Sequence, residues 1–196
     1  MDTTRPPAVE SIARLFASEG AADYLGEPVT QAAHMLQAGV LAEQAGAPPE
    51  LIAAALLHDV GHFTGTRTGH DLMRGTDNQH GEQGAAWLAQ WFGPLVTEPV
   101  RLHVAAKRYL CAVEPGYQAS LSPASLYTLG VQGGPMRADE ITEFEAGPYA
   151  SAACQVRRFD DQAKDPAATV PPFEHFAPLL AALARRRGDT GPSGRC

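Results

Sequence analysis

Four histidines and one aspartate of this 196-residue chain lie in or next to segments that we expect to be helical. His58 and Asp59 end the most apolar segment, AAALLHDVGH, and His34 lies within the apolar pattern of an earlier one. His80 follows a long loop, and His103 shares a helix face with the lysine four residues later. Burying an unpaired carboxylate is costly. One metal cluster accounts for all five residues, whereas ordinary packing would need a separate explanation for each.

Two other histidines have a simpler interpretation. His70 falls in the long loop, and His175 stands beside Phe173 and Phe176 in a pattern typical of ordinary packing. We expect neither to bind a metal.

A carboxylate late in the chain would complete the cluster, and Asp160 and Asp161 compete for that role. Helical periodicity places Asp160 on the stripe formed by Val156, Phe159 and Ala163, which we expect to face inward. Asp161 falls on the side of several basic residues, so we expect it to be exposed or to support the site indirectly. Asp160 is therefore the predicted ligand.

The predicted ligands are imidazoles and carboxylates, without a thiolate. Such a set suits iron, manganese or magnesium better than Cu(I) or structural zinc. Six side chains shared by two ions, with Asp59 able to bridge, leave open coordination positions, which are typical of catalytic sites. The six predicted ligands are His34, His58, Asp59, His80, His103 and Asp160.

The elements that hold these residues are expected to be helical. Segments rich in Ala and Leu alternate with Pro and Gly, and strand patterns are nearly absent. Thr30, Ser122 with Pro123, and Pro172 are expected to begin helices, and Gly61 to end the most apolar one. The expected helices cover residues 7–18, 31–44, 50–58, 80–92, 95–110, 122–130, 137–145, 149–164 and 172–187, with a long loop at 63–78. The sequence predicts an all-α, single-domain helical bundle.

Length and composition limit the domain count and the class of partner. A chain with 44% hydrophobic and 19% charged residues suits one globular domain. We expect this domain to span residues 1–187 and to be followed by a mobile tail at 188–196. The net charge of −7, with no basic block except an Arg triplet at 185–187, argues against nucleic acid as a partner.

The compartment can also be predicted. The 3 cysteines are widely spaced and form no CxxC pair, which fits a reducing environment. The N-terminus lacks a secretory pattern, and no apolar run approaches the ~20 residues that cross a bilayer. We expect a cytoplasmic protein without a membrane partner, as a monomer or a homodimer.

The order H…HD…H…H…D resembles the HD-domain superfamily. The flanking stretches resemble more specifically its mixed-valent di-iron oxygenase branch, which contains the PhnZ-type phosphonate oxygenases and is related to myo-inositol oxygenase. The resemblance covers about residues 23–176. Its motifs are DYLGEPVTQAAHMLQ, AALLHDVGH, NQHGEQGA, HVAAKRYL, SLSPASLYTLGVQGGPM and RRFDDQAKD.

The resemblance implies how the two irons would be held. One would be bound by His34, His58, Asp59 and Asp160, and the other by the bridging Asp59 with His80 and His103. Tyr24 matches a tyrosine that ligates an iron in the resting state. Glu27 matches a glutamate that contacts this tyrosine and the substrate amine. The residues that match positions holding the phosphonate or lining its pocket are His62, Lys107, Ser125, Gln132 and Arg157.

The resemblance also implies a reaction. It needs two iron ions as an Fe(II)/Fe(III) pair, O2 as co-substrate and a small organophosphonate, which is oxidised and cleaved to phosphate and a carboxylic acid. A phosphonate carries up to two negative charges, so cationic Lys107 and bidentate Arg157 are suitable partners. An amine-bearing substrate such as 2-amino-1-hydroxyethylphosphonate would place its cation at Glu27. A substrate with a quaternary ammonium group in place of the amine is a second possibility.

Two alternatives use the same residues. A metal-dependent phosphohydrolase acting on a nucleotide or small phosphate ester would need nearly the same ligands, but it has no evident need for Tyr24 and Glu27. A catalytically inactive HD module that binds a ligand would be expected to have lost ligands, whereas all six positions are filled here.

Overall fold

The computed structural model describes residues 6–18, 26–64 and 79–184, and every regular element in these ranges is a helix. This confirms the predicted all-α architecture. The helices are α1 (Pro7–Ser18), α2 (Gln31–Gln44), α3 (Pro49–Leu57), α4 (Gly61–Thr64), α6 (His80–Leu88), α7 (Pro94–Val113), α8 (Tyr117–Ser120), α9 (Pro123–Val131), α10 (Ala138–Ala146), α11 (Ala150–Gln162), the 3-10 helix η1 (Phe173–His175) and α12 (Ala177–Leu183).

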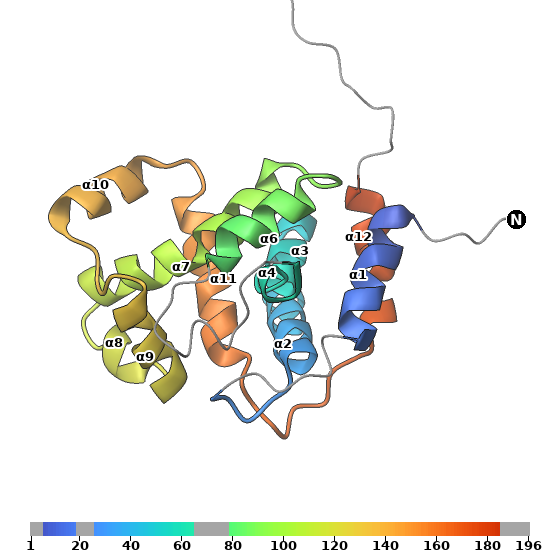
Figure 1. Cartoon of the computed structure of the whole chain (residues 1–196), viewed down its shortest axis with the longest axis horizontal. Helices are drawn as coiled ribbons and strands as arrows, with labels where there is room; N and C mark the ends of the chain where they lie inside the picture. Colours follow the sequence, from blue (N-terminus) through green and yellow to red (C-terminus); the bar gives the residue numbers. More distant parts are fainter. Residues whose placement is uncertain (1–5, 19–25, 65–78, 185–196) are drawn as a thin grey trace, which may run out of the picture.

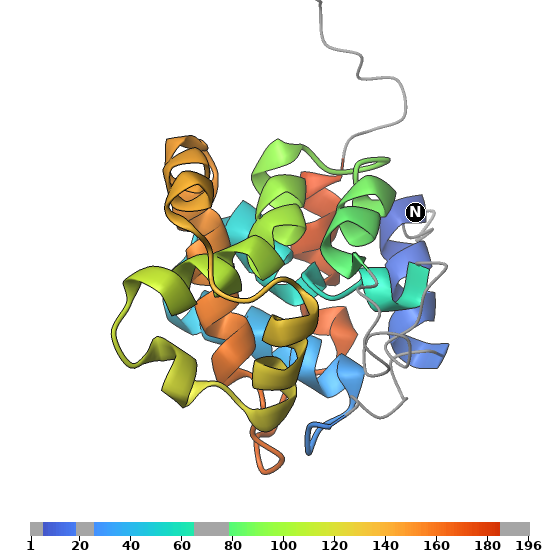
Figure 2. The same ribbon diagram turned by 60° about the vertical axis from the view of Figure 1, so that its left-hand side comes forward.

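The apolar helix α3 forms the centre of the bundle. Every residue from Leu51 to Leu57 is buried, and α3 packs against α2, α7, α11 and α12. Figures 1 and 2 show α1 beside α12 at one end of the molecule, and α8, α9 and α10 gathered at the other. The main core extends from α1 through α3 to α7, and a small apolar cluster around Phe144 lies between α7, α10 and α11.

Two predicted helix starts are confirmed by their capping hydrogen bonds. The side chain of Thr30 accepts from the backbone N–H of Ala33 at the start of α2. Ser122 Oγ accepts from the N–H of Ser125 at the start of α9, where Pro123 is the first helical residue. Both hydroxyls satisfy N–H groups that the first helical turn leaves without a partner.

Several predicted boundaries are wrong. The helix expected at 80–92 ends at Leu88, and residues 89–91 form a turn that leads to α7. The helix expected at 172–187 is divided into η1 and α12, since Pro178 cannot donate to the preceding turn. Gly61 begins α4 rather than ending α3.

Other expectations fall partly or wholly outside the described residues. Of the loop expected at 63–78, residues 65–78 lie outside them, as do the expected domain end at 187 and the tail at 188–196. Within the described ranges, no helix is long and apolar enough to cross a membrane.

Candidate metal centre and anion site

Asp59 lies between two histidine pairs, and each of its carboxylate oxygens faces one pair. Oδ2 is 3.7 Å from His34 Nε2 and 3.6 Å from His58 Nε2. Oδ1 is 3.3 Å from His80 Nε2 and 3.5 Å from His103 Nε2. All five side chains are buried. This arrangement suits a carboxylate that bridges two metal ions.

Four helical segments bring these residues together. His34 comes from the first turn of α2, and His58 and Asp59 follow directly on the C-terminal end of α3. His80 begins α6, and His103 lies in the middle of α7. The turn after α3 therefore carries the bridging carboxylate into the space between the other three helices.

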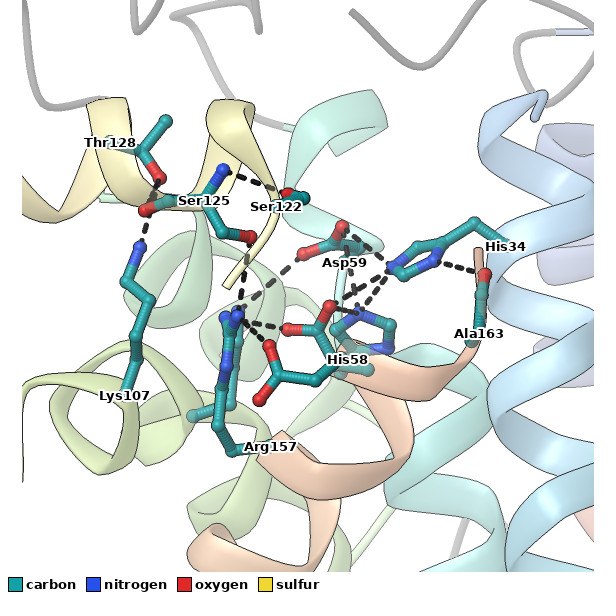
Figure 3. A network of polar contacts seen from close by, with 12 residues as sticks. His34, His58, Asp59, Lys107, Ser122, Ser125, Thr128, Arg157 and Ala163 are labelled. Atoms are coloured by element: carbon teal, nitrogen blue, oxygen red, sulfur yellow. Dashed lines mark hydrogen bonds and ion pairs between the residues drawn. The ribbon is translucent and has the colours of Figure 1, made fainter. Parts of the chain in front are cut away.

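Backbone carbonyls fix the tautomers of three of these rings. His34 Nδ1 lies 2.8 Å from the carbonyl oxygen of Ala163, which Figure 3 shows at the edge of the cluster. His58 Nδ1 and His103 Nδ1 lie 2.8 and 2.7 Å from the carbonyl oxygens three residues earlier. A carbonyl oxygen only accepts, so each Nδ1 must carry the proton and donate it. In the neutral rings the lone pair is then on Nε2.

The Nε2 atoms within each pair are close enough to share an ion. His34 Nε2 is 3.1 Å from His58 Nε2, and His80 Nε2 is 3.0 Å from His103 Nε2. In the His34–His58 pair, the Nε2 lone pairs of neutral rings would face each other and repel at this distance, whereas a cation bound by both would remove the repulsion. Nitrogen atoms about 3 Å apart can each lie at the typical metal–imidazole distance of about 2.1 Å from a common ion. The residues present therefore fit a metal at each pair.

Asp160 and Asp161 have different surroundings. Asp160 is buried, and its Oδ1 lies 3.4 Å from His34 Nε2 and 3.8 Å from His58 Nε2. This oxygen is fully buried and has no hydrogen-bond partner among the described residues, as expected for an atom that binds a metal. Asp161 instead accepts from Tyr117 and Arg157. The predicted helix phase thus agrees with the observed orientation.

His62 also approaches the second histidine pair. Its Nε2 is 3.8 Å from Asp59 Oδ1, and its ring stacks on that of His80 at a centroid distance of 4.2 Å. The atoms of Asp59, His62 and His80 lie close enough to form an alternative metal-binding group. Burial lowers the pKa of His62, so its ring is neutral at pH 7. His175, in contrast, pairs with Glu43 at the surface, and His70 lies outside the described residues.

Lys107 is a buried cation beside this cluster. Its side chain is one helical turn from His103, and Nζ donates to Thr128 Oγ1 at 2.9 Å. Burial, followed by the charge of Arg157, lowers the pKa of Lys107 to about 7. An anionic ligand would favour its charged form and offset the cost of burial.

Arg157 lies between Lys107 and the predicted metal ligands (Figure 3). Its guanidinium donates to Asp160 Oδ2 at 2.8 Å, to Ser125 Oγ at 3.3 Å and to Asp161. Figure 3 shows Arg157 between the Lys107–Thr128 pair and the group of His34, His58 and Asp59. Although burial opposes the charged form, Asp160 and Asp161 hold the pKa of Arg157 well above its usual range. The guanidinium is therefore a permanent charge next to the metal ligands.

Two further predicted contacts are also near α9. Gln132 caps the end of α9, and its buried Oε1 has no hydrogen-bond partner in the part of the chain that the structure describes. Glu27 Oε1 accepts from Lys164 Nζ at 2.7 Å and from Ser122 Oγ at 2.5 Å. Tyr24, predicted to contact Glu27 and iron, lies outside the described residues.

Comparison with known proteins agrees with this geometry. The chain matches the HD domain family over residues 32–125. It is 47% identical over 172 residues to a [1-hydroxy-2-(trimethylamino)ethyl]phosphonate dioxygenase (glycine-betaine-forming) from Leisingera caerulea, covering 88% of each protein. It is 44% identical over 171 residues to a hydroxymethylphosphonate dioxygenase from Gimesia maris, covering 86% of this chain and 84% of the relative.

The chain belongs to the HD-domain phosphonate dioxygenases. This confirms the family that the sequence motifs indicated. A less similar relative, an uncharacterised protein of Acanthamoeba polyphaga mimivirus, is 34% identical over 174 residues, which cover 88% of this chain and 80% of that protein.

For this HD-domain phosphonate dioxygenase, sequence reasoning missed three residues that support the site. Gln31 donates to Asp59 Oδ2 at 3.0 Å; it lies one turn before His34, and that spacing could have indicated it. Tyr117 donates to Asp161 and accepts from Arg157 at 3.2 Å. Its distance of 40 residues from Arg157 along the chain leaves no local signal. Lys164 donates to Glu27 at 2.7 Å, and no local pattern predicted that contact.

Proposed function

We propose that this chain is a di-iron oxygenase that uses O2 to break the C–P bond of a 1-hydroxyphosphonate, releasing a carboxylic acid and phosphate. One observation carries the proposal: a buried carboxylate, Asp59, lies between two histidine pairs beside the buried cations Lys107 and Arg157. The names of two relatives that act on hydroxyphosphonates support this choice of substrate class.

Each histidine pair would hold one of the two metal ions. One iron would be held by His34, His58, Asp59 and Asp160, and the other by Asp59, His80 and His103, with Tyr24 as a ligand in the resting state. The Fe(II)/Fe(III) pair, when bound, would supply the activation of O2 and the oxidation of the hydroxyl-bearing carbon. Gln31 would hold Asp59 in its bridging orientation through the hydrogen bond to Oδ2.

The phosphonate would bind between α7, α9 and α11. Lys107 would contribute a charge with no carboxylate partner within hydrogen-bonding distance in the described structure, and Arg157 could offer donors in a fixed plane. Ser125 and Gln132 would complete the contacts, because the unpartnered Gln132 Oε1 can accept from a substrate hydroxyl or a protonated phosphonate oxygen.

His62 and Glu27 would act on the rest of the substrate. His62 is neutral at pH 7 and close to Asp59, which supports a role in accepting the proton of the substrate hydroxyl. Glu27 would face the substituent on the hydroxyl-bearing carbon.

The ratio of O2 consumed to phosphate released tests this proposal. Iron-loaded protein should consume one O2 for each phosphate released from hydroxymethylphosphonate or from a 2-amino- or 2-trimethylamino-1-hydroxyethylphosphonate, and it should release none without O2. Partly oxidised protein should show a half-integer-spin EPR signal that changes when substrate is added. Phosphate release from phosphate esters under anaerobic conditions would support the phosphohydrolase instead.

A further inference from the structure

Glu27 already has a cationic partner within the chain. Lys164 Nζ is 2.7 Å from Glu27 Oε1, and the two side chains are only 12% and 6% exposed. Ser122 Oγ donates to the same carboxylate oxygen. A buried ion pair of this kind neutralises the carboxylate before any ligand enters.

The same lysine also reaches the proposed phosphonate contacts. Lys164 Nζ donates to Ser125 Oγ at 2.9 Å, and Ser125 Oγ also accepts from Arg157 at 3.3 Å. A continuous series of contacts therefore runs from Glu27 through Lys164, Ser125 and Arg157 to Asp160. The Lys164 ammonium therefore lies between Glu27, which is proposed to face the substituent of the substrate, and Ser125, which is proposed to contact its phosphonate.

These contacts affect which kind of ligand the Glu27 carboxylate can bind. Glu27 Oε1 is occupied by Lys164 and Ser122, and Oε2 accepts no hydrogen bond from the described residues. A substrate cation at Oε2 would meet a carboxylate that already has a counter-ion, and it would be repelled by the charge of Lys164. An uncharged substituent meets no such penalty and leaves the ion pair in place.

We propose that Lys164 is a specificity-determining residue: as the resident counter-ion of Glu27, it allows the site to accept 1-hydroxyphosphonates with an uncharged substituent and opposes those with a cationic one. This inference rests on the proposed 1-hydroxyphosphonate oxygenase function. Without Lys164, an uncharged substrate would leave the Glu27 carboxylate buried and unpaired, whereas a cationic substrate would pair with it.

Turnover of two substrates tests the inference. The ratio of kcat/KM for 1-hydroxy-2-(trimethylamino)ethylphosphonate to that for hydroxymethylphosphonate is measured with the iron-loaded wild type, Lys164→Met and Lys164→Gln. We expect the ratio to rise about tenfold or more in both variants. The Lys164→Gln side chain can keep hydrogen bonds to the serines, so it tests the charge if Lys164→Met does not fold. Lys164→Arg keeps the charge and should preserve the wild-type ratio within about threefold.

A double variant tests whether the effect depends on the ion pair between Glu27 and Lys164. In Lys164→Gln with Glu27→Gln, no buried charge is left uncompensated, and the ratio should fall back toward that of Glu27→Gln alone. A ratio in Lys164→Gln within twofold of wild type would overturn the inference, as would an equal rise in Lys164→Arg.

A binding experiment separates this inference from the reaction itself. Ethylphosphonate and 2-aminoethylphosphonate lack the 1-hydroxyl group and differ in one cationic amine. Calorimetric titration should show that Lys164→Gln shifts the affinity ratio about tenfold or more toward the amine, and no shift would count against the inference. If the wild type cleaves no hydroxyphosphonate with O2, the proposed function fails, while this titration still decides whether Lys164 opposes a bound cation.

Discussion

At the scale of single residues, one oxygen atom distinguishes the two adjacent aspartates. Asp160 Oδ1 is buried, accepts no hydrogen bond within the described ranges and faces two histidine nitrogens. Asp161 is occupied by Tyr117 and Arg157. Although burial opposes ionisation, the charges of Arg157 and His58 hold the pKa of Asp160 well below its usual range. It is therefore a carboxylate at neutral pH, as a ligand must be.

The first prediction compares these two residues. Asp160→Asn should lose about half of the bound iron, because an amide replaces a charged ligand at one of the two ions. Asp161→Asn should retain both ions, since that side chain contacts Arg157 and Tyr117 instead. Metal analysis of the purified variants measures both outcomes, and the exposed His175→Ala variant is the control. Retention of both irons in Asp160→Asn would remove this residue from the ligand set.

At the scale of elements, the close contact between α4 and α6 places His80. A Cβ atom on Gly61 would lie 1.9 Å from the carbonyl oxygen of His80 and 2.9 Å from the backbone nitrogen of Gly84. Both are backbone atoms, so neither can move aside as a flexible side chain could. The absence of a side chain at Gly61 is therefore what allows α6 to begin beside Asp59.

The second prediction follows from this contact. Gly61→Ala should lower the free energy of unfolding by about 2 kcal/mol or more, since the two helices must separate, and it should reduce metal binding by displacing His80. The matched control is Gly130→Ala in α9, where an added Cβ meets no atom within 4 Å. That change should be neutral or stabilising by about 0.5–1 kcal/mol, because alanine favours the helix. Urea unfolding and metal analysis test both variants, and equal stability of the two would contradict the packing argument.

At the scale of the whole molecule, burial of the histidine cluster couples folding to pH. Burial lowers the pKa of His58 to about 4 and that of His80 to about 3, from the ordinary 6.5. As the pH falls below 6.5, the unfolded chain takes up protons at these residues while the folded protein does not. Stability therefore falls with pH across this window, by about 1.4 kcal/mol per pH unit for each group.

Two other histidines modify this balance. Burial also lowers the pKa of His62, which adds to the loss. Burial of His34 acts in the same direction, but Asp160 and Asp59 outweigh it and raise its pKa. The stabilisation from His34 is complete below pH 6.5 and is lost as the pH rises through its folded pKa. Below pH 6.5 the contribution of His34 is therefore constant, the three lowered pKa values set the slope, and the net stability falls on acidification.

The third prediction concerns metal-free protein. Its thermal unfolding midpoint should fall steadily from pH 7 to pH 5, and His58→Gln should flatten this dependence because one titrating group is removed. The His175→Ala variant should keep the wild-type slope. Calorimetric scans at several pH values measure these slopes, and an unchanged slope in His58→Gln would contradict the assignment. Bound metal should protect the protein in the same window, since it requires neutral imidazoles.

The sequence by itself determined the class of fold and the residue types of the site. Apolar helical patterns and capping residues such as Thr30 and Ser122 act locally, so the helices they begin could be predicted. His34, His58 and Asp59 were recognisable because a polar group in an apolar segment needs a partner. His80 and His103 were added because one metal cluster accounts for all these residues.

Only the tertiary structure decided which atoms meet. Asp59 faces two histidine pairs because α2, α6 and α7 converge on the turn after α3, and no local pattern encodes that convergence. The pairing of Glu27 with Lys164 joins residues 137 positions apart. Periodicity specifies the face of a helix but not the neighbour against which that face packs, and the chemistry of this site depends on those neighbours.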